Sequence, residues 1–546
     1  MRLSRFYPAA IFLVLSVAVF GQQPLSFQAT LPPAPKAVSF VLPESEKTEN
    51  FGKSGQLPVM GKTIAAELSI RGNGQWDRLG DQVVWRLKIA APGAQGILVY
   101  PDSMLLPEGG KLFIYSTDKK LHFGPYTHSD NPEGGSFALD LVATDEIILE
   151  YNAPAAMATP SLHINEIGYA YRMVKKKSDR DFGGSGSCEV NVNCPEGADW
   201  LAQKNSVARI LLKISNTFGW CSGALINNAR LDCTPYILSA DHCYQDDQTQ
   251  TTASTSDLNQ WKFYFKYESG SCANPAAEPA SKVFTGCTFT ANSNDNGGAT
   301  GSDFVLLKLK STPADSLNLF YAGWDASGAA ADSGVGIHHP EGDIKKISTF
   351  KSRLTSDSYG NTVANTHWSV TWNATSTGHG VTEQGSSGSP IFNAEHLVVG
   401  ALTGGYSKCA DPTQPDYYGK LSYSWISNGI ANNRRLKPWL DPDNTGLLKL
   451  NGSYRPCQAT GIALTQETPI FRIAPNPVSD IVEIFTNANG QSINIFSNLG
   501  QLMFSGRTDS STSLAIHTNL WPEGVYFVTV SDDQQHQATQ KLLVVH

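Results

Sequence analysis

Short apolar runs, interrupted by proline, glycine and aspartate, recur along the chain and predict β-strands rather than long helices. Strand-like runs in the N-terminal and C-terminal parts lie at residues 97–100, 112–115, 147–151, 493–496 and 525–528. In the central part, the spacing favours helical turns around residues 430–439. We therefore expect an all-β protein with many turns.

The first 21 residues have the pattern of a secretory signal peptide. Arg2 and Arg5 precede an apolar run at residues 9–20, which is too short to indicate a membrane span. We expect cleavage near Gln22. No later segment of the sequence reaches spanning length, so the mature protein should be secreted or attached to the cell surface.

The composition limits the function classes. With 546 residues the chain is too long for one ordinary core and should contain several domains. Its 48 glycines, 30 prolines and 16% charged residues suit a β-rich globular protein. A net charge of -8 gives no reason to expect a nucleic-acid partner. The sequence has no nucleotide-binding glycine loop and no zinc signature, so we expect no cofactor.

Three short motifs carry residues that suit nucleophilic catalysis. They read Leu-Ser-Ala-Asp-His-Cys at 238–243, Gly-Ser-Asp-Phe-Val-Leu-Leu at 301–307 and Gly-Ser-Ser-Gly-Ser-Pro at 385–390. A serine hydroxyl needs an imidazole to take its proton, and a buried carboxylate then fixes the tautomer of that imidazole. Ser387, His242 and Asp303 are therefore the candidate nucleophile, base and orienting carboxylate.

The order of these residues distinguishes between types of serine hydrolase. The order His242, Asp303, Ser387 is that of the chymotrypsin type, and a nucleophile elbow would need glycine where Ser389 stands. We therefore expect a chymotrypsin-like double β-barrel, with His242 and Asp303 from the first barrel and Ser387 from the second. The backbone N–H groups of Gly385 and Ser387 should form the oxyanion hole. Taken singly, the motif of Ser387 also fits a turn, His242 also fits a structural histidine, and Asp303 also fits the start of a strand.

Nine cysteines favour disulfides over metal ligands in an exported chain that has no Cys-x-x-Cys pair. Eight of them lie within or at the edges of the region with the three motifs. Cys457 lies beyond it and is our candidate for the unpaired cysteine.

The region with the three motifs resembles the bacterial lysyl endopeptidases over about residues 183–450. The matching stretches are Gly-Ser-Cys at 186–188, Cys-Pro-Glu-Gly at 194–197, Tyr-Ala-Gly-Trp-Asp at 321–325, Ile-His-His-Pro at 337–340, Val-Thr-Glu at 381–383, Trp-Leu-Asp-Pro at 439–442 and Thr-Gly at 445–446. This resemblance implies a secreted serine endopeptidase that cleaves after lysine. It also implies the bridges Cys188–Cys409, Cys194–Cys272 and Cys221–Cys243. Cys233 and Cys287 have no counterpart in the family, so we expect them to pair with each other.

The same resemblance implies that Asp416, which begins an Asp-Tyr-Tyr-Gly motif, binds the substrate lysine. Asp411 is the rival, and Asp416 could also be an ordinary surface-loop residue. Tyr359 and Thr403 stand where the family has a stacked tryptophan and histidine, so specificity for arginine or for both bases stays open. Ser386 stands where trypsin-like zymogens have aspartate, so we do not expect activation by a buried N-terminal ammonium.

The pair His338 and His339 suggests a metal at first sight. Adjacent side chains rarely converge on one ion without further ligands, so we expect a structural or surface role and no metal site.

The region between the signal peptide and the motifs carries no recognisable chemistry. We interpret residues 22–182 as a propeptide that aids folding or inhibits the enzyme, with a permanent accessory domain as the alternative. The basic run at residues 175–177 is either a solvated linker or a processing site. If the enzyme selects lysine, Lys177 offers a site for self-cleavage.

The last part of the chain resembles the sorting domain of type IX secretion. The matching stretches are Pro-Asn-Pro at 475–477, Asn-Leu-Gly-Gln at 498–501, Gly-Val-Tyr-Phe at 524–527 and Lys-Leu-Leu-Val-Val at 541–545. We expect a small β-sandwich at 471–546 after a linker at 451–470. A carbohydrate-binding or adhesive module is the alternative.

These expectations describe a protease exported through the periplasm. Its partners would be peptide or protein substrates and the type IX secretion machinery, and we expect a monomer. The rival function from another class is a surface adhesin built on an inactive protease fold.

Overall fold

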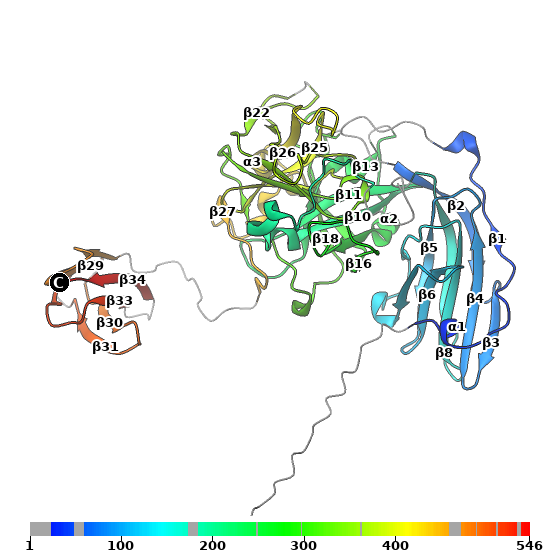
Figure 1. Cartoon of the computed structure of the whole chain (residues 1–546), viewed down its shortest axis with the longest axis horizontal. Coiled ribbons are helices and arrows are strands. Elements are labelled where there is room, and N and C mark those ends of the chain that lie inside the picture. Colours follow the sequence, from blue (N-terminus) through cyan, green and yellow to red (C-terminus); the bar gives the residue numbers. More distant parts are fainter. Residues whose placement is uncertain are drawn as a thin grey trace, which may run out of the picture. The chain divides into compact units, whose positions relative to one another are not determined.

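The computed structural model describes residues 23–546, except for 48–58, 173–183, 247–248, 296, 361–362, 458–470, 487–488, 509–511 and 532–536. The expected signal peptide and the basic run at 175–177 therefore lie outside the described residues. The chain divides into two compact units, Met1–Cys457 and Gln458–His546 (Figure 1).

The N-terminal domain is built almost wholly from strands. Its elements are α1 (Leu25–Gln28), β1 (Val38–Ser39), β2 (Val59–Ser69), β3 (Gln75–Leu79), β4 (Gln82–Ala90), β5 (Gly96–Leu105), β6 (Lys111–Ser116), β7 (His122–Tyr126), β8 (Glu146–Pro154) and β9 (Ser161–Ala170). One sheet has the order β1-β4-β8-β6-β7, with β3 beside β4, and the other contains β2, β9 and β5. The strand-like runs at 97–100, 112–115 and 147–151 lie in β5, β6 and β8, as predicted.

A single hydrophobic core joins the sheets of this domain. Ile147, Leu149 and Tyr151 alternate along β8 and are almost completely buried, because side chains at every second position of a strand share one face. They pack in the same cluster as Ile97 and Val99 of β5, which belongs to the other sheet.

The middle domain has many short strands and few helical turns. Its strands are β10 (Val207–Ile214), β11 (Thr217–Ile226), β12 (Tyr236–Ser239), β13 (Gln245–Asp246), β14 (Thr251–Thr252), β15 (Lys262–Phe265), β16 (Lys282–Thr285), β17 (Cys287–Asn292), β18 (Val305–Leu309), β19 (Trp324–Asp325), β20 (Gly334–His338), β21 (Lys346–Phe350), β22 (Thr355–Asp357), β23 (His367–Val370), β24 (Pro390–Asn393), β25 (Val398–Gly405), β26 (Asp416–Lys420) and β27 (Lys449–Leu450). Its α-helices are α2 (Thr255–Gln260), α3 (Leu421–Ile426) and α4 (Lys437–Leu440).

Short 3-10 helices complete the first compact unit. They are η1 (Glu44–Glu46), η2 (His128–Asp130), η3 (Pro195–Trp200), η4 (Gln203–Ser206), η5 (Asp241–Cys243), η6 (Asp315–Leu317), η7 (Pro340–Gly342) and η8 (Asn432–Arg434). The helical turns predicted around 430–439 correspond to η8 and α4. The helix α3 lies just before that window and was not predicted.

The middle domain contains two large, mainly antiparallel sheets, as the sequence predicted, and the small sheet β13-β14. The first has the order β16-β15-β10-β11-β12-β18-β17, and the second has the order β21-β20-β24-β25-β26-β23-β22. Each sheet surrounds its own apolar cluster, and a third cluster with Trp324, Phe304 and Val335 contains residues of both. The domain is therefore a chymotrypsin-like double β-barrel.

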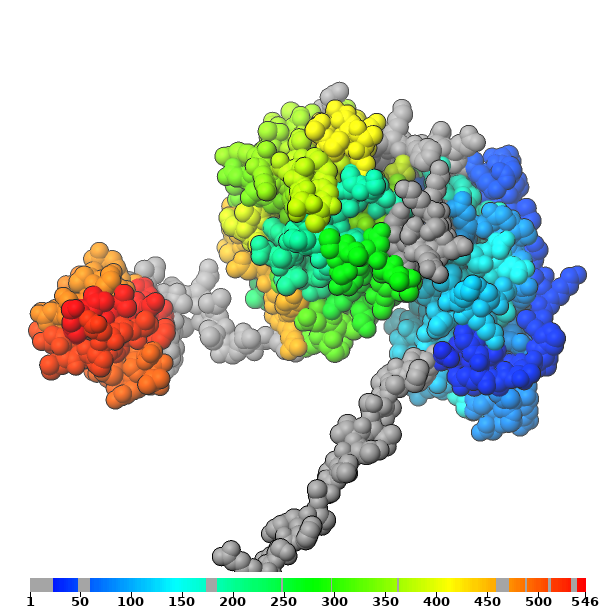
Figure 2. All heavy atoms as spheres, in the orientation of Figure 1, coloured from blue at the N-terminus to red at the C-terminus, as the bar shows by residue number. Residues whose placement is uncertain are grey.

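The first barrel and the N-terminal domain share one continuous sheet (Figure 1). In the space-filling view the blue and cyan N-terminal domain lies against the green part of the middle domain (Figure 2). The strand β2 pairs antiparallel with β11 at Thr217, Phe218 and Gly219. Two nearby ion pairs cross between the domains: Lys213 Nζ lies 3.0 Å from Glu166, and Lys262 Nζ lies 2.9 Å from Asp140. Both lysines are buried.

Four disulfides cross-link the first compact unit. They join Cys188 to Cys409, Cys194 to Cys272, Cys221 to Cys243, and Cys233 to Cys457. The first three are the bridges that the family resemblance implied. The expected bridge between Cys233 and Cys287 is wrong, and so is the expectation that Cys457 is unpaired.

The position of each cysteine in the fold explains this correction. Cys287 begins β17, where its side chain is buried in the core of the first barrel without a disulfide partner. Cys233 lies in a loop that is reached by the segment after β27, where Tyr321 and Ser453 exchange backbone hydrogen bonds of 2.8 and 2.9 Å. That return brings Cys457 to Cys233, so the compact unit extends past residue 450.

The C-terminal domain consists of two small sheets around an apolar core. Its strands are β28 (Phe471–Ala474), β29 (Ile481–Thr486), β30 (Ser492–Ser497), β31 (Leu502–Arg507), β32 (Ser513–His517), β33 (Gly524–Ser531) and β34 (Gln537–Val544). The orders are β28-β29-β32 and β31-β30-β33-β34. The predicted runs at 493–496 and 525–528 lie in β30 and β33.

Helices in the described part of the chain are all short. None of them combines the length and apolar character that crossing a membrane would require.

Candidate active site

The imidazole of His242 is held by the carboxylate of Asp303. His242 lies in η5, shortly after β12, and Asp303 lies shortly before β18. These two strands pair with Ser239 opposite Val305. The Nδ1 of His242 is 2.7 Å from Oδ2 of Asp303, and the backbone N–H of His242 donates to Oδ1 over 3.0 Å. Both side chains are fully buried. The carboxylate therefore fixes the ring with the Nδ1 proton facing it.

A second carboxylate supports the unusual backbone of Asp303. Asp303 has a φ of 50°, in the left-handed region that side chains other than glycine rarely adopt. Its backbone N–H donates to Oδ2 of Asp295 over 2.8 Å. Burial, with the nearby charge of Asp303, raises the pKa of Asp295 to about 6. Nothing in the sequence pattern singled out Asp295.

Ser387 lies where the two barrels meet. It precedes β24 of the second barrel, and its carbonyl accepts a hydrogen bond of 2.8 Å from the backbone N–H of Ser222 in the first. The same carbonyl lies 3.9 Å from Sγ of Cys243, the residue after His242. The Cys221–Cys243 sulfurs and a ring nitrogen of His242 lie within 4.8 Å of one another. The fold thus places the backbone of Ser387 beside the residue that follows His242.

Gly385 has a backbone that aims its N–H away from neighbouring acceptors. Its φ is 85°, and a Cβ at this position would lie 2.9 Å from the backbone nitrogen of Gly342. The carbonyl of Gln384 accepts the N–H of Glu341. The C=O and N–H of a trans peptide point in opposite directions, so the Gly385 N–H faces away from that contact. Among the described residues, the backbone N–H groups of Gly385 and Ser387 have no acceptor.

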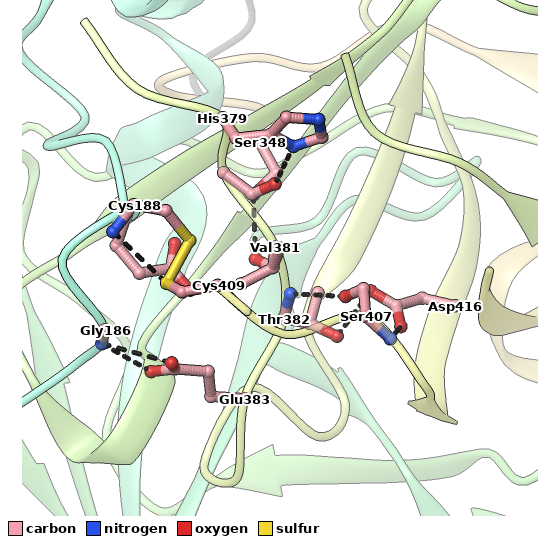
Figure 3. Close-up of a disulfide and its surroundings, with 12 residues drawn as sticks. Gly186, Cys188, Ser348, His379, Val381, Thr382, Glu383, Ser407, Cys409 and Asp416 are labelled. Carbon is pink, nitrogen blue, oxygen red and sulfur yellow. Dashed lines mark hydrogen bonds between the residues drawn. A yellow bond between two sulfur atoms is a disulfide. The ribbon is translucent and has the colours of Figure 1, made fainter. Parts of the chain in front are cut away.

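Asp416 is a fully buried carboxylate at the start of β26. Its Oδ2 accepts hydrogen bonds from Nε1 of Trp372 at 2.7 Å, Oγ1 of Thr382 at 2.8 Å and Oγ of Ser407 at 2.5 Å. The backbone N–H of Ser407 donates to Oδ1 over 3.1 Å (Figure 3). Burial raises the pKa of Asp416 above its ordinary value.

The rival carboxylate has a different environment. Asp411 lies in a turn, where its side chain accepts hydrogen bonds from the exposed residues Thr413 and Gln414. These contacts are those of a surface turn.

Tyr359 and Thr403 both contact a histidine, His367, that the sequence analysis missed. Nε2 of His367 is 2.9 Å from Oγ1 of Thr403, and the ring of Tyr359 is 5.7 Å from the ring of His367. This group adjoins Asp303, because a Cβ built on Gly298 would lie 3.1 Å from Cβ of Asp303 and 3.2 Å from Nε2 of His367. Burial lowers the pKa of His367 to about 4, so its imidazole is neutral.

His338 and His339 are both buried, so the surface role considered for them is wrong. Nδ1 of His338 is 2.8 Å from Oγ of Ser386, and its Nε2 is 3.2 Å from Oγ of Ser348. Nδ1 of His339 donates to the carbonyl of Asp343 over 2.9 Å. The rings bind protein groups beside the segment that carries Ser387.

The donors to Asp416 were also missed. Thr382 belongs to the Val-Thr-Glu motif noted in the sequence, and Trp372 precedes it by ten residues. Their local sequence gives no sign of a shared partner, because β23, β25 and β26 bring them together only in the folded barrel.

Comparisons with known proteins agree with this geometry. Residues 182–419 match the family described as lysyl endopeptidase, C-terminal domain, and residues 472–545 match the secretion system C-terminal sorting domain. The lysyl endopeptidase of Pseudomonas aeruginosa is 30% identical over 350 residues, which cover 61% of this chain and 69% of that protein.

Solved structures of microbial proteases are more distant in sequence. A thermostable serine protease, AL20, from an extremophilic microorganism is 14% identical, with a TM-score of 0.31, covering 43% of this chain and 97% of its own. The protease Anisep of Arthrobacter nicotinovorans is 17% identical, with a TM-score of 0.29, covering 40% of this chain and 90% of its own.

Proposed function

Because this chain belongs to the lysyl endopeptidase family and is a secreted serine endopeptidase, we propose that it cleaves peptide bonds after lysine by a Ser-His-Asp mechanism. The observation that carries this proposal is the hydrogen bond of 2.7 Å between His242 and Asp303 beside the segment of Ser387. Membership of the family favours an active enzyme over the adhesin considered from the sequence.

In the proposed reaction, Ser387 attacks the carbonyl carbon of the substrate while His242 takes the hydroxyl proton. The imidazolium is stabilised by Asp303 and then gives its proton to the leaving amine, which produces an acyl-enzyme. Water, activated by the same imidazole, hydrolyses that ester and releases the serine.

The oxyanion of the tetrahedral intermediate would be bound by the backbone N–H groups of Gly385 and Ser387. Their lack of acceptors within the described residues supports this role, because a donor that is already unpaired needs no rearrangement when charge develops. Losing one such donor typically costs about 100- to 1000-fold in rate.

Asp416 would bind the substrate lysine. An ammonium that leaves water needs a compensating charge, and a buried carboxylate fixed by three donors supplies one without moving. The buried position of Asp416 favours it over Asp411. Tyr359 and Thr403 would contribute beside the triad, through their contacts with His367.

The N-terminal domain would be an inhibitory propeptide. A small cleft is lined by Met60 and Arg172 of this domain together with Glu341 and Gly385 of the middle domain. Residues of the N-terminal domain thus lie beside the proposed oxyanion hole, which supports a block of the substrate site in the precursor. Cleavage near Lys177, by the enzyme itself, would begin its removal.

The C-terminal domain is a secretion sorting domain, and the chain is exported by the type IX route. This match favours sorting over the carbohydrate-binding or adhesive role considered from the sequence. The partners are therefore peptide substrates and the secretion machinery, and we propose that the mature enzyme is a monomer.

Sequencing the peptides from one digested protein tests the specificity. We expect cuts after lysine, and cuts after arginine at equal frequency would contradict it. The variant Ser387→Ala should be inactive, take up no fluorophosphonate label and accumulate as an unprocessed chain. Normal processing of this variant with no other protease present would exclude self-cleavage at Lys177.

A further inference from the structure

The segment before the nucleophile is a tight loop closed by Glu383 and Ser386. The backbone N–H of Ser386 donates to the carbonyl of Glu383 over 3.0 Å, and the N–H of Glu383 donates to Oγ of Ser386 over 3.2 Å. Ser387 follows directly. Any displacement of Glu383 therefore moves the residue next to the nucleophile.

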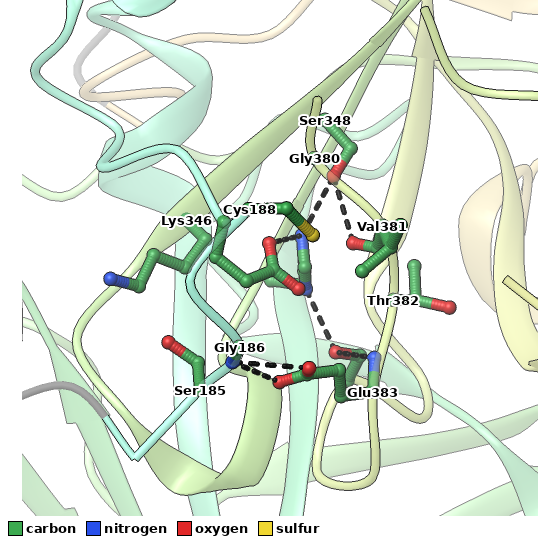
Figure 4. Close-up of polar contacts among 12 residues, drawn as sticks. Ser185, Gly186, Cys188, Lys346, Ser348, Gly380, Val381, Thr382 and Glu383 are labelled. Carbon is green, nitrogen blue, oxygen red and sulfur yellow. Dashed lines mark hydrogen bonds and ion pairs between the residues drawn. The ribbon is translucent and has the colours of Figure 1, made fainter. Parts of the chain in front are cut away.

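The side chain of Glu383 reaches out of this loop to a distant part of the chain. Its two carboxylate oxygens accept the backbone N–H of Gly186 at 3.1 and 3.0 Å (Figure 4). Gly186 belongs to the segment that joins the N-terminal domain to the first barrel. Next to it, Ser185 donates its hydroxyl to Asp343 over 2.6 Å.

Position 186 accepts no side chain. A Cβ built on Gly186 would lie 2.6 Å from Oε1 of Glu383 and 2.4 Å from Sγ of Cys409. Both contacts are shorter than a carbon atom tolerates, so glycine is needed for the carboxylate and the disulfide to approach the backbone together.

The same segment is tied to the proposed lysine pocket. Cys188 is bridged to Cys409, and its carbonyl accepts the N–H groups of His379 at 3.1 Å and Gly380 at 3.0 Å. The chain then runs through Val381 to Thr382, which donates to Asp416 (Figure 3). Gly186 thus contacts the nucleophile loop, and Cys188 contacts the segment that leads to the pocket.

His338 adds a second connection within this network. Its ring bridges Ser386 to Ser348. The hydroxyl of Ser348 donates to the carbonyl of Val381 over 2.9 Å (Figure 4). The nucleophile loop is therefore held at Glu383 by Gly186 and at Ser386 by His338 of the second barrel.

We propose that Glu383 is a positioning residue, which holds the nucleophile loop in its active shape by binding the main chain at Gly186. The inference rests on the proposed role of Ser387. In trypsin-like zymogens, a newly formed N-terminal ammonium activates the enzyme. Here the carboxylate of Glu383 would do so by accepting the internal backbone N–H of Gly186. The active shape of the loop is consequently independent of where the precursor is cut, as long as residues 185–188 are kept.

The test compares variants of the full chain after maturation. The parent, Glu383→Ala, Glu383→Gln and Gly186→Ala are assayed for kcat and KM on a lysyl-amide substrate and for the rate of fluorophosphonate labelling. The Tm of each variant is measured by thermal unfolding, and the assays are run well below the lowest Tm. Ser187→Ala and Glu395→Gln, both at exposed positions, are the matched controls.

We expect Glu383→Ala and Gly186→Ala to lower kcat/KM and the labelling rate by about tenfold or more, since small displacements of reacting groups are costly. Glu383→Gln keeps an acceptor oxygen and should stay within about threefold of the parent. The controls should match the parent. If Glu383→Ala is not secreted, the pair Gly186→Ala and Ser187→Ala decides the question.

Parental kcat/KM in Glu383→Ala, or equal losses in Gly186→Ala and Ser187→Ala, would overturn the proposal. Mature chains that begin at residue 181 and at residue 184 should have equal kcat/KM; a strong dependence on the first residue would favour a terminal ammonium instead. Activity in Ser387→Ala would refute the proposed nucleophile, and that result is separate from any result at Glu383.

Discussion

Trp372 donates its indole N–H to Oδ2 of Asp416 over 2.7 Å in the interior of the second barrel. Thr382 and Ser407 donate to the same oxygen. Three fixed donors on one oxygen orient the carboxylate and balance part of its charge. The remaining charge is then available to a cationic substrate group.

Replacing Asp416 with asparagine should abolish most of the activity on lysine. Asparagine keeps one acceptor oxygen for the three side-chain donors but has no charge for the substrate ammonium. We expect kcat/KM on a lysyl-amide substrate to fall by about 100-fold or more, as for other pairs of buried charges that lose one partner. Asp411→Asn is the control, and a comparable loss in that variant would contradict the assignment.

The ion pairs of Glu268 should make the stability of the protein depend on pH. It lies 2.9 Å from Lys204 and 3.0 Å from Lys345, and these lysines lower the pKa of Glu268 to about 2 against the opposing effect of burial. A lowered carboxylate pKa stabilises the fold above the unfolded value of 4.5, and this contribution is lost as pH falls through about 2. Its size is about 3 kcal/mol at pH 7.

The measurement is urea unfolding of Glu268→Gln in a Ser387→Ala background, which prevents self-digestion. The loss of stability should be largest at pH 7 and should shrink between pH 4.5 and 2. Glu395→Gln, which removes an exposed ion pair, should change little at any pH. A difference that is constant across this range would show that the pair does not control the pH dependence.

The Cys233–Cys457 bridge should determine which cysteine reacts with an alkylating reagent. Non-reducing peptide mapping should find these two cysteines linked and Cys287 as a free thiol. Burial raises the pKa of Cys287, so an alkylating reagent should modify it only after unfolding. The double variant Cys233→Ser with Cys457→Ser should lose about 2–4 kcal/mol. Alkylation of Cys457 in the native protein would contradict this pairing.

Asp140 should stabilise the chain for as long as the proposed propeptide remains attached. It binds Lys262 at 2.9 Å and accepts the hydroxyl of Tyr264 at 2.8 Å, so Asp140→Asn leaves a buried ammonium without its counter-charge. We expect the urea midpoint of the Ser387→Ala precursor to fall, by an amount equivalent to about 3–5 kcal/mol. Asp145→Asn, at an exposed position, is the control. An unchanged midpoint would mean that the pair does not stabilise the interface.

The double barrel could be predicted, and so could the pairing of His242 with Asp303, because these residues and Ser387 belong to distinctive local motifs in a diagnostic order. The strands could be predicted from apolar runs between turn residues. Asp295 and His367 could not, because each acts through a neighbour that only the folded chain supplies. Asp295, for example, binds the backbone of Asp303 rather than its side chain.

The cysteines illustrate the same limit. Three bridges follow from family resemblance, whereas Cys233, Cys287 and Cys457 have no family pattern to guide them. Cys287 is enclosed in a barrel, and Cys457 returns to the surface loop of Cys233 through contacts far apart in sequence. A pairing of this kind depends on the path of the chain, which residue spacing does not contain.

The pairing of β2 in the N-terminal domain with β11 in the first barrel also bears on the mature enzyme. If the N-terminal domain is removed as proposed, β2 leaves with it, and Thr217, Phe218 and Gly219 of β11 lose their partner strand on that side. So short an edge offers a passing polypeptide few hydrogen bonds, which limits self-association of the mature enzyme. The proposed maturation would therefore turn this part of β11 from an interior strand into an edge strand.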